Sequence, residues 1–498
     1  MPQLNLLDRR LKFTHAAHST AKIDFFCLSE LHDDTSTPGV KKIEHYLGGL
    51  SEGVLFPIDV EARHFMVALD LDALQRKYGL DNERLGDGHL SALIGGKISG
   101  LLFSSPFFKQ DDVLSVKLSP KLKVAVKEKV DFLVAAEHQS VNNRLEGEVK
   151  TRSVVLDSYF ESEDYLKAAA ISDGMLVTRS LINWPANMLN PATYEDFIRD
   201  LLKAWGPRWK GNISMESIDA KRLSDEGAGL ISAVGRGAKE GPRILKLVWE
   251  PESKPKGSGI ALVGKGITYD TGGLDIKPSS SMRLMKKDMG GSAAVLGSFL
   301  ALAISGYQQK VTLWLPLAEN SISSDSFRPG DVYKALNGKL VEIDNTDAEG
   351  RLILADALVY AAREVPKVIV DVATLTGAAR VALGPEVDSA FTNRREFGPL
   401  IQQASLQTGD WVWPMPRVPQ YKSYFESSQI ADMENGGGKF AGAVVGALFL
   451  EHFVGDLPWI HIDSYMWAEK PTLMARESGP NPKMVRFLCK LMETLRSI

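Results

Sequence analysis

Short apolar strand patterns alternate with longer helical patterns between residues 259 and 463, and this alternation constrains the fold more than any other feature of the sequence. Continuous apolar runs of this length are typical of strands buried on both faces. The sequence therefore predicts an α/β domain with a mixed, largely parallel sheet flanked by helices. The strand patterns are GIALVG at 259–264, KVTLWLP at 310–316, KLVEID at 339–344, KVIVDVAT at 367–374 and LPWIHID at 457–463.

The chain of 498 residues is longer than one hydrophobic core usually supports, which predicts two domains. We predict a smaller N-terminal α/β domain at 1–160, a linker helix at 161–185 and a larger C-terminal domain at 186–498. Prolines 185 and 191 mark the end of the linker helix. In the N-terminal part the strand-like runs are AKIDFFCLSE, GVLFPID, VLSVKLS and KVDFLVAAEH, and the helix-like runs are GVKKIEHYLGG and LDALQRKYG.

Composition and charge indicate a soluble cytoplasmic protein without a membrane partner. Charged residues make up 24% of the chain and the net charge is -4, which gives no electrostatic sign of nucleic-acid binding but leaves room for a local basic patch. The apolar runs at 293–306 and 440–453 are shorter than the roughly 18 residues that span a bilayer. Cys27 and Cys489 both lie in apolar sequence, as reduced thiols in the cytosol do.

Acidic and basic residues gather where predicted strands end or helices begin. In such a sheet, ligands bind beyond the carboxyl ends of the strands. In NTDAEGRL the charges fall on alternate residues, so in an extended segment they would project to one side. The three segments place Lys265, Asp270 and Lys277 after the first strand, Asp288 before a helix, and Asp347, Glu349 and Arg351 before the next helix.

The acids in these segments favour a metal centre over isolated surface charges. Asp288 alone is better explained as a helix N-cap. Several carboxylates at neighbouring strand ends, however, would repel one another unless cations held them. A histidine-based zinc site is excluded here, because only His452 and His461 follow residue 138, and we interpret both as structural. Lys265, if deprotonated beside the dications, could serve as a ligand. Such a centre activates water for hydrolysis.

Three segments resemble the signature sequences of the leucyl aminopeptidases, the cytosol aminopeptidase family of dinuclear zinc or manganese exopeptidases. These segments are VGKGITYDTGG, MKKDMGG and NTDAEGRL. The segments NWPANMLNP, ADMENGGG and AGAVVGALFLEHFV are also similar to that family, so the likeness covers residues 175–498. It implies that the C-terminal domain is the catalytic metallopeptidase domain and that Lys265 and Asp288 bind one metal, Asp347 the other, while Asp270 and Glu349 bridge both.

The resemblance also implies a reaction. Lys277 and Arg351 would be catalytic, Asp288 would help to hold the free amine of a peptide, and a water activated by two metals would attack the carbonyl that Lys277 polarises. The ions would be zinc, manganese or magnesium, and Arg351 would hold a bicarbonate ion. The requirement for a free amine would limit cleavage to the N-terminal residue. Family members are homohexamers with clustered catalytic domains.

The chain departs from the family in the segment that lines the pocket for the N-terminal side chain. Members usually follow their His-x-Asp with Ile-Ala-Gly, whereas this chain has HIDSYMWAEK, which puts Tyr465 in place of alanine. Met285, Thr374 and Gly377 match the other pocket residues, although a methionine like Met285 is more often packing and Thr374 could equally serve only the backbone. We expect Tyr465 to shift preference away from leucine.

Two other functions are compatible with the same residues. Another dinuclear metallohydrolase, such as a phosphatase, would use the same acids and cations but would need no substrate amine. A DNA-binding or regulatory protein could also keep this fold, because some family members bind DNA. Peptide cleavage that is lost on chelation separates the aminopeptidase from the binding protein.

Overall fold

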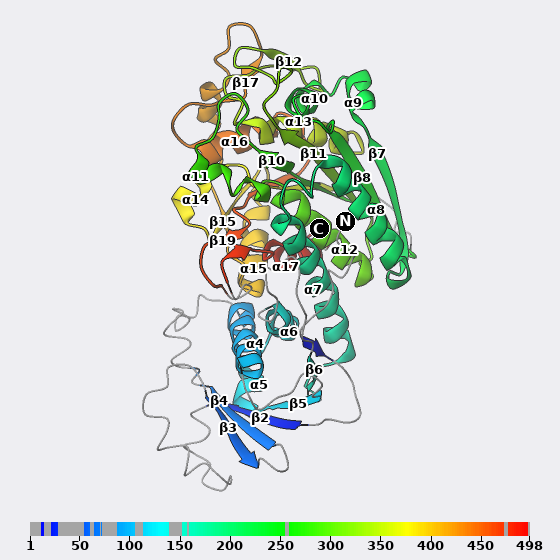
Figure 1. Cartoon of the computed structure of the whole chain (residues 1–498), viewed down its shortest axis with the longest axis vertical. Helices are drawn as coiled ribbons and strands as arrows, with labels where there is room; N and C mark the ends of the chain where they lie inside the picture. Colours follow the sequence, from blue (N-terminus) through cyan, green and yellow to red (C-terminus); the bar gives the residue numbers. More distant parts are fainter. Residues whose placement is uncertain are drawn as a thin grey trace.

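Figure 1 shows the computed structural model of the chain, in which a smaller N-terminal part lies below a larger part. The structure describes residues 11–13, 21–27, 54–59, 64–69, 71, 87–104, 113–138, 152–156, 159–253, 258–472 and 477–496. Two predicted helical runs lie outside these residues. They are GVKKIEHYLGG and LDALQRKYG, of which only the first residue of the second run is described.

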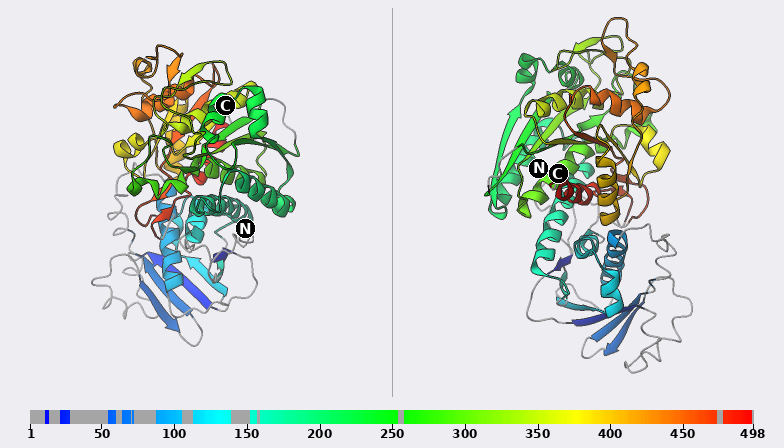
Figure 2. Two further views of the ribbon diagram at one scale, coloured as in Figure 1. Left: turned by 45° about the horizontal axis from the view of Figure 1, so that its top comes forward. Right: turned by 180° about the vertical axis from the view of Figure 1, so that it is seen from behind.

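The N-terminal part is built on a six-stranded sheet. Only the pair β3–β4 is antiparallel, and the other neighbouring strands pair in parallel. Helices α4 and α6 lie between this sheet and the larger part (Figures 1 and 2). In spatial order the strands are β1 (Leu11–Phe13), β6 (Arg152–Leu156), β5 (Val113–Leu118), β2 (Ala21–Cys27), β4 (His64–Leu69) and β3 (Val54–Asp59), and the helices are α4 (Asp87–Ser104), α5 (Pro120–Ala125) and α6 (Lys129–His138).

The segment KVDFLVAAEH forms helix α6, so its interpretation as a strand is wrong. Its residues 131–135 are all buried, because the helix packs against both α4 and α7 (Ser162–Asn183). A helix covered on more than one side has no polar stripe, and a short apolar run of this kind cannot be distinguished from a buried strand by its periodicity.

The larger part contains a nine-stranded mixed sheet. The central strands pair in parallel and are apolar and buried along their length, whereas β7 and β8 form an antiparallel edge on which β7 alternates in burial. The order is β16 (Val412–Pro414), β15 (Asp388–Thr392), β18 (Trp459–Asp463), β14 (Val368–Ala373), β9 (Ile260–Gly264), β11 (Val311–Asn320), β8 (Arg243–Pro251) and β7 (Gly211–Ile218), with β10 (Gly266–Asp270) beside the end of β11.

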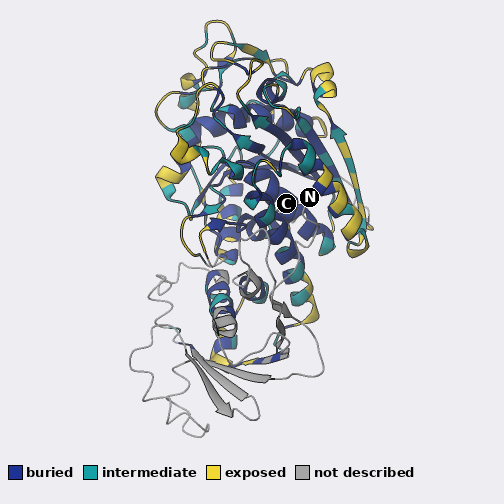
Figure 3. Ribbon diagram, in the orientation of Figure 1, coloured by how far each residue is buried: buried dark blue, intermediate teal, exposed yellow. Residues whose placement is uncertain are grey.

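Helices cover both faces of this sheet and bury two hydrophobic cores. Figure 3 shows buried residues concentrated in the interior of the larger part, with exposed residues mainly on its outside. The first core is continuous with the buried residues of the N-terminal part. Its helices are α7, α8 (Pro191–Trp205), α12 (Gly290–Ile304), α15 (Phe397–Thr408) and α17 (Met484–Leu495); those of the second core are α9 (Ala220–Glu226), α10 (Gly229–Gly235), α13 (Glu349–Arg363), α14 (Gly377–Leu383) and α16 (Gly442–Glu451).

Helix α12 is the central apolar helix of the first core. Its small residues allow close contact with α7, where a Cβ atom on Gly174 would lie 2.2 Å from the carbonyl oxygen of Gly297. The segment Met285–Ile304 is long and apolar enough to cross a membrane, but 94% of its apolar window is buried inside the fold. This segment is therefore interpreted as a core helix of the fold.

One predicted strand lies outside the main sheet. KLVEID contributes β13 (Leu340–Glu342), which pairs with β12 (Val332–Lys334) and β17 (Met433–Glu434) in a separate three-stranded sheet. A further short pair joins β19 (Trp467–Ala468) to β20 (Gly479–Pro480), and the helical turn α11 (Ser279–Met282) follows β10.

The parallel strands β9, β14 and β18 all end at one edge of the main sheet, where the charged segments lie.

Candidate metal centre

The charged segments meet at the carboxyl ends of the central strands, as their sequence positions predict. The residues come from different elements that share this edge. Lys265 follows β9, Asp270 ends β10, Asp288 precedes α12, Asp347 lies in the loop before α13, and Glu349 is the first residue of α13.

The expectation that NTDAEGRL is extended is wrong from Glu349 onward. Glu349 and Arg351 occupy the first turn of α13, where residues two apart point about 200° from each other around the axis. Glu349 therefore faces the other acids, while Arg351 contacts the loop at Gly436.

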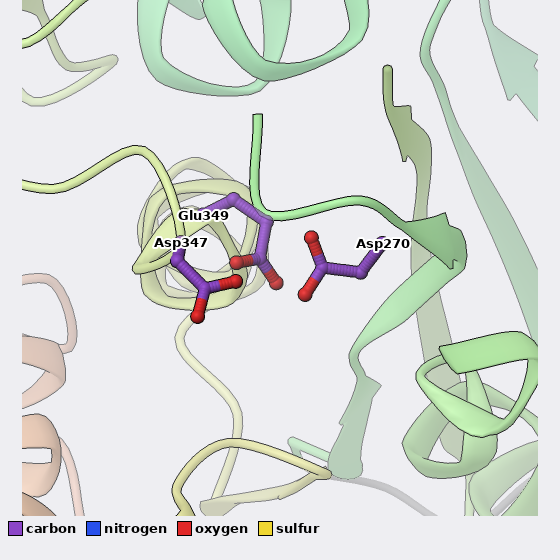
Figure 4. A group of neighbouring side chains, drawn as sticks. All are labelled: Asp270, Asp347 and Glu349. Carbon is purple, nitrogen blue, oxygen red and sulfur yellow. The ribbon is translucent and has the colours of Figure 1, made fainter. Parts of the chain in front are cut away.

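Three carboxylates converge closely enough to share a cation. Ligand oxygens of Asp270, Asp347 and Glu349 all lie within 4.8 Å of one another. Figure 4 shows the carboxylate groups of Asp270 and Glu349 pointing toward each other, with Asp347 beside Glu349. Asp270 and Glu349 are almost fully buried, so little water is available to separate their charges.

Two lysines lie among these acids as counter-charges. The ammonium of Lys265 lies 2.9 Å from Asp288 and 3.0 Å from Glu349, and that of Lys277 lies 2.8 Å from Asp270 and also contacts Asp347. Burial alone lowers the pKa of both lysines, but the surrounding carboxylates outweigh burial and raise it. Both side chains are thus charged in the absence of a metal.

The acids outnumber these lysines. Burial and repulsion from Asp270 raise the pKa of Glu349 well above its usual value and that of Asp347 to about 6. With Asp288 included, four carboxylates face two ammonium groups.

Two of the carboxylate oxygens face only the lysines. Asp347 Oδ1 contacts Lys277 and Glu349 Oε1 lies 3.0 Å from Lys265, and neither oxygen accepts a further hydrogen bond within the described residues. Buried oxygen ligands with excess negative charge fit divalent cations, and zinc, manganese or magnesium each suit such a donor set.

Side chains that the sequence did not single out hold these acids in place. The amide of Asn320, at the end of β11, donates to Asp270 Oδ1 at 2.9 Å. The hydroxyl of Thr374 donates to Asp288 Oδ1 at 2.7 Å, and its carbonyl accepts from Lys265. Thr374 therefore positions an acid as well as lining the site. Asn320 is a polar residue at the end of a long apolar strand, and this position is the sequence feature that indicates a role at the site.

Arg351 is a buried cation with one hydrogen-bond donor that has no acceptor among the described residues. Its Nη1 donates to the carbonyl oxygen of Gly436 at 2.6 Å, and its guanidinium lies over the ring of Phe449. The Nε–H group has no acceptor among the described residues. Burial lowers the pKa of Arg351 to about 10, so it remains charged at neutral pH. The loop that contains Gly436 thus helps to hold this guanidinium.

All the site residues predicted from the sequence line one cavity of about 1000 Å³. They are Lys265, Asp270, Lys277, Met285, Asp288, Asp347, Glu349, Arg351, Thr374, Gly377 and Tyr465. Three further residues, which the sequence did not single out, line the cavity beside Tyr465: Lys287, Arg380 and Glu469. Burial lowers the pKa of Lys287 to about 8.

The late histidines take no part in this cavity. His461 is fully buried in β18, where its Nδ1 lies 2.6 Å from Asp371 and its ring stacks on Trp459. His452 follows α16 and packs edge-on against Phe425. Both positions agree with the structural interpretation.

The fold and the site together define a class: α/β proteins that gather carboxylates for divalent cations at the carboxyl ends of parallel strands. The sequence places this chain within that class more narrowly. Residues 176–489 match the family model described as "Cytosol aminopeptidase family, catalytic domain". The chain belongs to the cytosol aminopeptidase family.

Individual relatives agree with this assignment. A probable cytosol aminopeptidase from Aquifex aeolicus is 42% identical over 286 residues, which are 57% of each chain. The cytosol aminopeptidase structure from Coxiella burnetii has a TM-score of 0.79 at 27% identity and covers 97% of this chain and 99% of its own. The bottromycin maturation enzyme BotP in complex with Mn has a TM-score of 0.79 at 26% identity, covering 96% of this chain and 99% of its own. In sequence, the chain thus spans less than two thirds of the curated relatives' length.

Proposed function

We propose that the chain is a metal-dependent aminopeptidase that hydrolyses the N-terminal amino acid from peptides with a free N-terminus. The observation that carries this proposal is the meeting, in one cavity, of a carboxylate cluster with two lysines and a buried arginine. Membership of the cytosol aminopeptidase family supports it.

We assign the metal ligands by position: Lys265, once a dication displaces its proton, and Asp288 to one ion, Asp347 to the other, with Asp270 and Glu349 shared. Two such divalent ions would supply a water of lowered pKa and polarise the scissile carbonyl. The carboxylate of Asp288 would help to hold the substrate amine. The ammonium of Lys277 would lie against the carbonyl oxygen and stabilise the charge that develops there.

Arg351 would hold a small anion rather than a substrate group. Its Nε–H is buried without an acceptor and its guanidinium lines the cavity, which suits bicarbonate or another planar anion. A bicarbonate ion at this position could accept the proton of the attacking water. The acids themselves would then be left to bind the cations.

We propose that the working protein is a cytoplasmic homohexamer with zinc, manganese or magnesium in its sites. The manganese complex of BotP supports manganese, and the names of the curated cytosol aminopeptidases support the compartment. We also propose the division into an N-terminal domain at 1–160, a linker helix at 161–185 and a catalytic domain at 186–498; the two separate sheets support it.

The test compares an unblocked leucyl peptide with its N-acetylated form, using metal-free protein reconstituted with zinc, manganese or magnesium. We expect only the unblocked peptide to release its N-terminal amino acid, because a metal and Asp288 would bind the free amine. Glu349→Ala should lower kcat/KM by about 1000-fold or more, since it removes a shared ligand. Release is followed by chromatography of the free amino acid.

Glu319→Ala is the matched control, because Glu319 also lies near a strand end but does not line the cavity. Equal cleavage of both peptides would point to a different dinuclear hydrolase. Metal binding without any cleavage would refute the aminopeptidase and favour a regulatory or DNA-binding protein on this fold.

A further inference from the structure

Lys287 places a buried ammonium in the wall of the cavity without an acidic partner. It ends the short helical turn that precedes Asp288, and only 6% of its surface is exposed. Among the described residues, its ammonium makes no hydrogen bond or ion pair, and it lies over the ring of Tyr465, 4.7 Å from the ring centroid. A cation–π contact compensates a buried charge only in part.

The acids near Lys287 are engaged by other donors. The carboxylate of Asp288 accepts from the ammonium of Lys265 and the hydroxyl of Thr374. That of Asp463 accepts from backbone N–H groups of Leu375 and Thr376 and from the Thr376 hydroxyl. Neither acid lies within ion-pair distance of Lys287.

Tyr465 and its neighbours form the rest of this wall. Arg380 lies over the Tyr465 ring at 4.7 Å and donates to its hydroxyl at 2.8 Å. The charge of Arg380 is matched by Glu469, 3.4 Å away and about half exposed. With that pair neutral, Lys287 leaves this side of the cavity with one excess positive charge.

We propose that this wall selects peptides whose N-terminal residue is acidic, with the side-chain carboxylate of aspartate or glutamate paired to Lys287. This inference rests on the proposed aminopeptidase function and names its substrate class. Lys287 lines the same cavity as Asp288, the residue assigned to the substrate amine, and lies over Tyr465, so the side chain of the bound N-terminal residue would lie near this ammonium. A leucine side chain would cover the charge without pairing it, which is unfavourable in a buried site.

The test measures kcat/KM for peptides X-Ala-Ala in which X is glutamate, aspartate, glutamine, asparagine or leucine, with manganese-loaded protein. Glutamate and glutamine have the same shape and differ in charge, so their ratio isolates the ion pair. We expect the acidic peptide of at least one isosteric pair to exceed its amide by about tenfold or more.

Lys287→Met should reduce this ratio to about one, and Lys287→Arg should retain a ratio above one, because it keeps the charge. Lys286→Met is the matched control: it removes the same charge from the neighbouring residue, which lies outside the cavity and bonds to Asn183. It should keep the wild-type ratio. The folded state of each variant is checked by circular dichroism.

The outcomes separate the two proposals. Cleavage of the leucine and glutamine peptides without preference for the acids, or an equal loss for all peptides in Lys287→Met, would overturn the pocket inference and leave the aminopeptidase intact. If no unblocked peptide is cleaved, the proposed function fails and the pocket inference fails with it. If Lys287→Met does not fold, the ratio of kcat/KM for the acidic peptide to that for its amide still tests the pocket inference, measured in the wild type and in Lys287→Arg.

Discussion

Gly350 lies so close to Lys265 that no side chain fits between them. A Cβ atom at Gly350 would be 2.2 Å from Lys265 Cε and 2.5 Å from its Nζ. The glycine in NTDAEGRL therefore lets the lysine reach Asp288 and Glu349. The sequence predicted Lys265 at the site, but its contact with Gly350 depends on how α13 approaches the end of β9.

Gly350→Ala should lower kcat/KM by about 100-fold while leaving the protein folded. The new methyl group displaces Lys265, and small displacements of site groups have effects of this size. Alanine also favours a helix over glycine by about 1 kcal/mol, so instability would not explain the loss. Peptide cleavage and thermal unfolding are measured together.

Gly398→Ala serves as its control, because a Cβ atom there meets nothing within 4 Å and Gly398 lies in the distant helix α15. Unchanged activity in Gly350→Ala would show that Lys265 does not need its observed position.

At the scale of elements, helix α13 is tied to its neighbours by one buried carboxylate. Asp356 accepts hydrogen bonds from the backbone N–H groups of Leu230, Ile231 and Leu336 at 2.8–3.0 Å. The first two lie at the start of α10, whose N-terminal N–H groups have no partners within the helix. An aspartate inside an apolar helical pattern gave no sign in sequence of which backbone it would bind.

Asp356→Ala should lower the free energy of unfolding by about 3–5 kcal/mol, because three buried N–H groups lose their acceptor. Asp356→Asn keeps one acceptor oxygen and should lose less. Urea unfolding measures both. Asp225→Ala, on the exposed face of α9, should change stability by less than about 0.5 kcal/mol. A loss for Asp356→Ala no larger than for Asp225→Ala would contradict the structural role of this carboxylate.

At the scale of the whole molecule, a buried arginine joins the N-terminal part to the larger one. Arg486 in α17 contacts Asp410 at 2.8 Å and Asp131 of α6 at 3.0 Å. Burial raises the pKa of Asp131 to about 7. The charge of Arg486 lowers this pKa in part, and the charge of Asp410 raises it again. The two acids thus share one cation at the junction.

The raised pKa predicts that this junction weakens as pH rises. An unfolded aspartate titrates near about pH 4, so between about pH 4 and 7 the unfolded chain releases the proton that folded Asp131 retains. The contribution of Asp131 is therefore full below about pH 4 and is lost as pH approaches 7. Asp131→Asn should remove this dependence, which amounts to about 3–4 kcal/mol in the wild type.

The measurement is urea unfolding from pH 4 to 7.5, with the difference between wild type and Asp131→Asn taken at each pH. Asp225→Asn, which removes an exposed acid, is the control. A difference that stays constant across this range would mean that Asp131 titrates alike in both states.

The sequence alone determined the α/β class, the helical pattern at 161–185 and the charged residues at the strand ends, because local periodicity and short motifs are properties of neighbouring residues. Tertiary structure decided that KVDFLVAAEH is a helix and that KLVEID belongs to a small separate sheet. It also decided that Lys287 and Arg380, from different segments, lie against the same face of the cavity around Tyr465. Burial and pairing depend on what packs from elsewhere in the chain, and no local pattern contains that information.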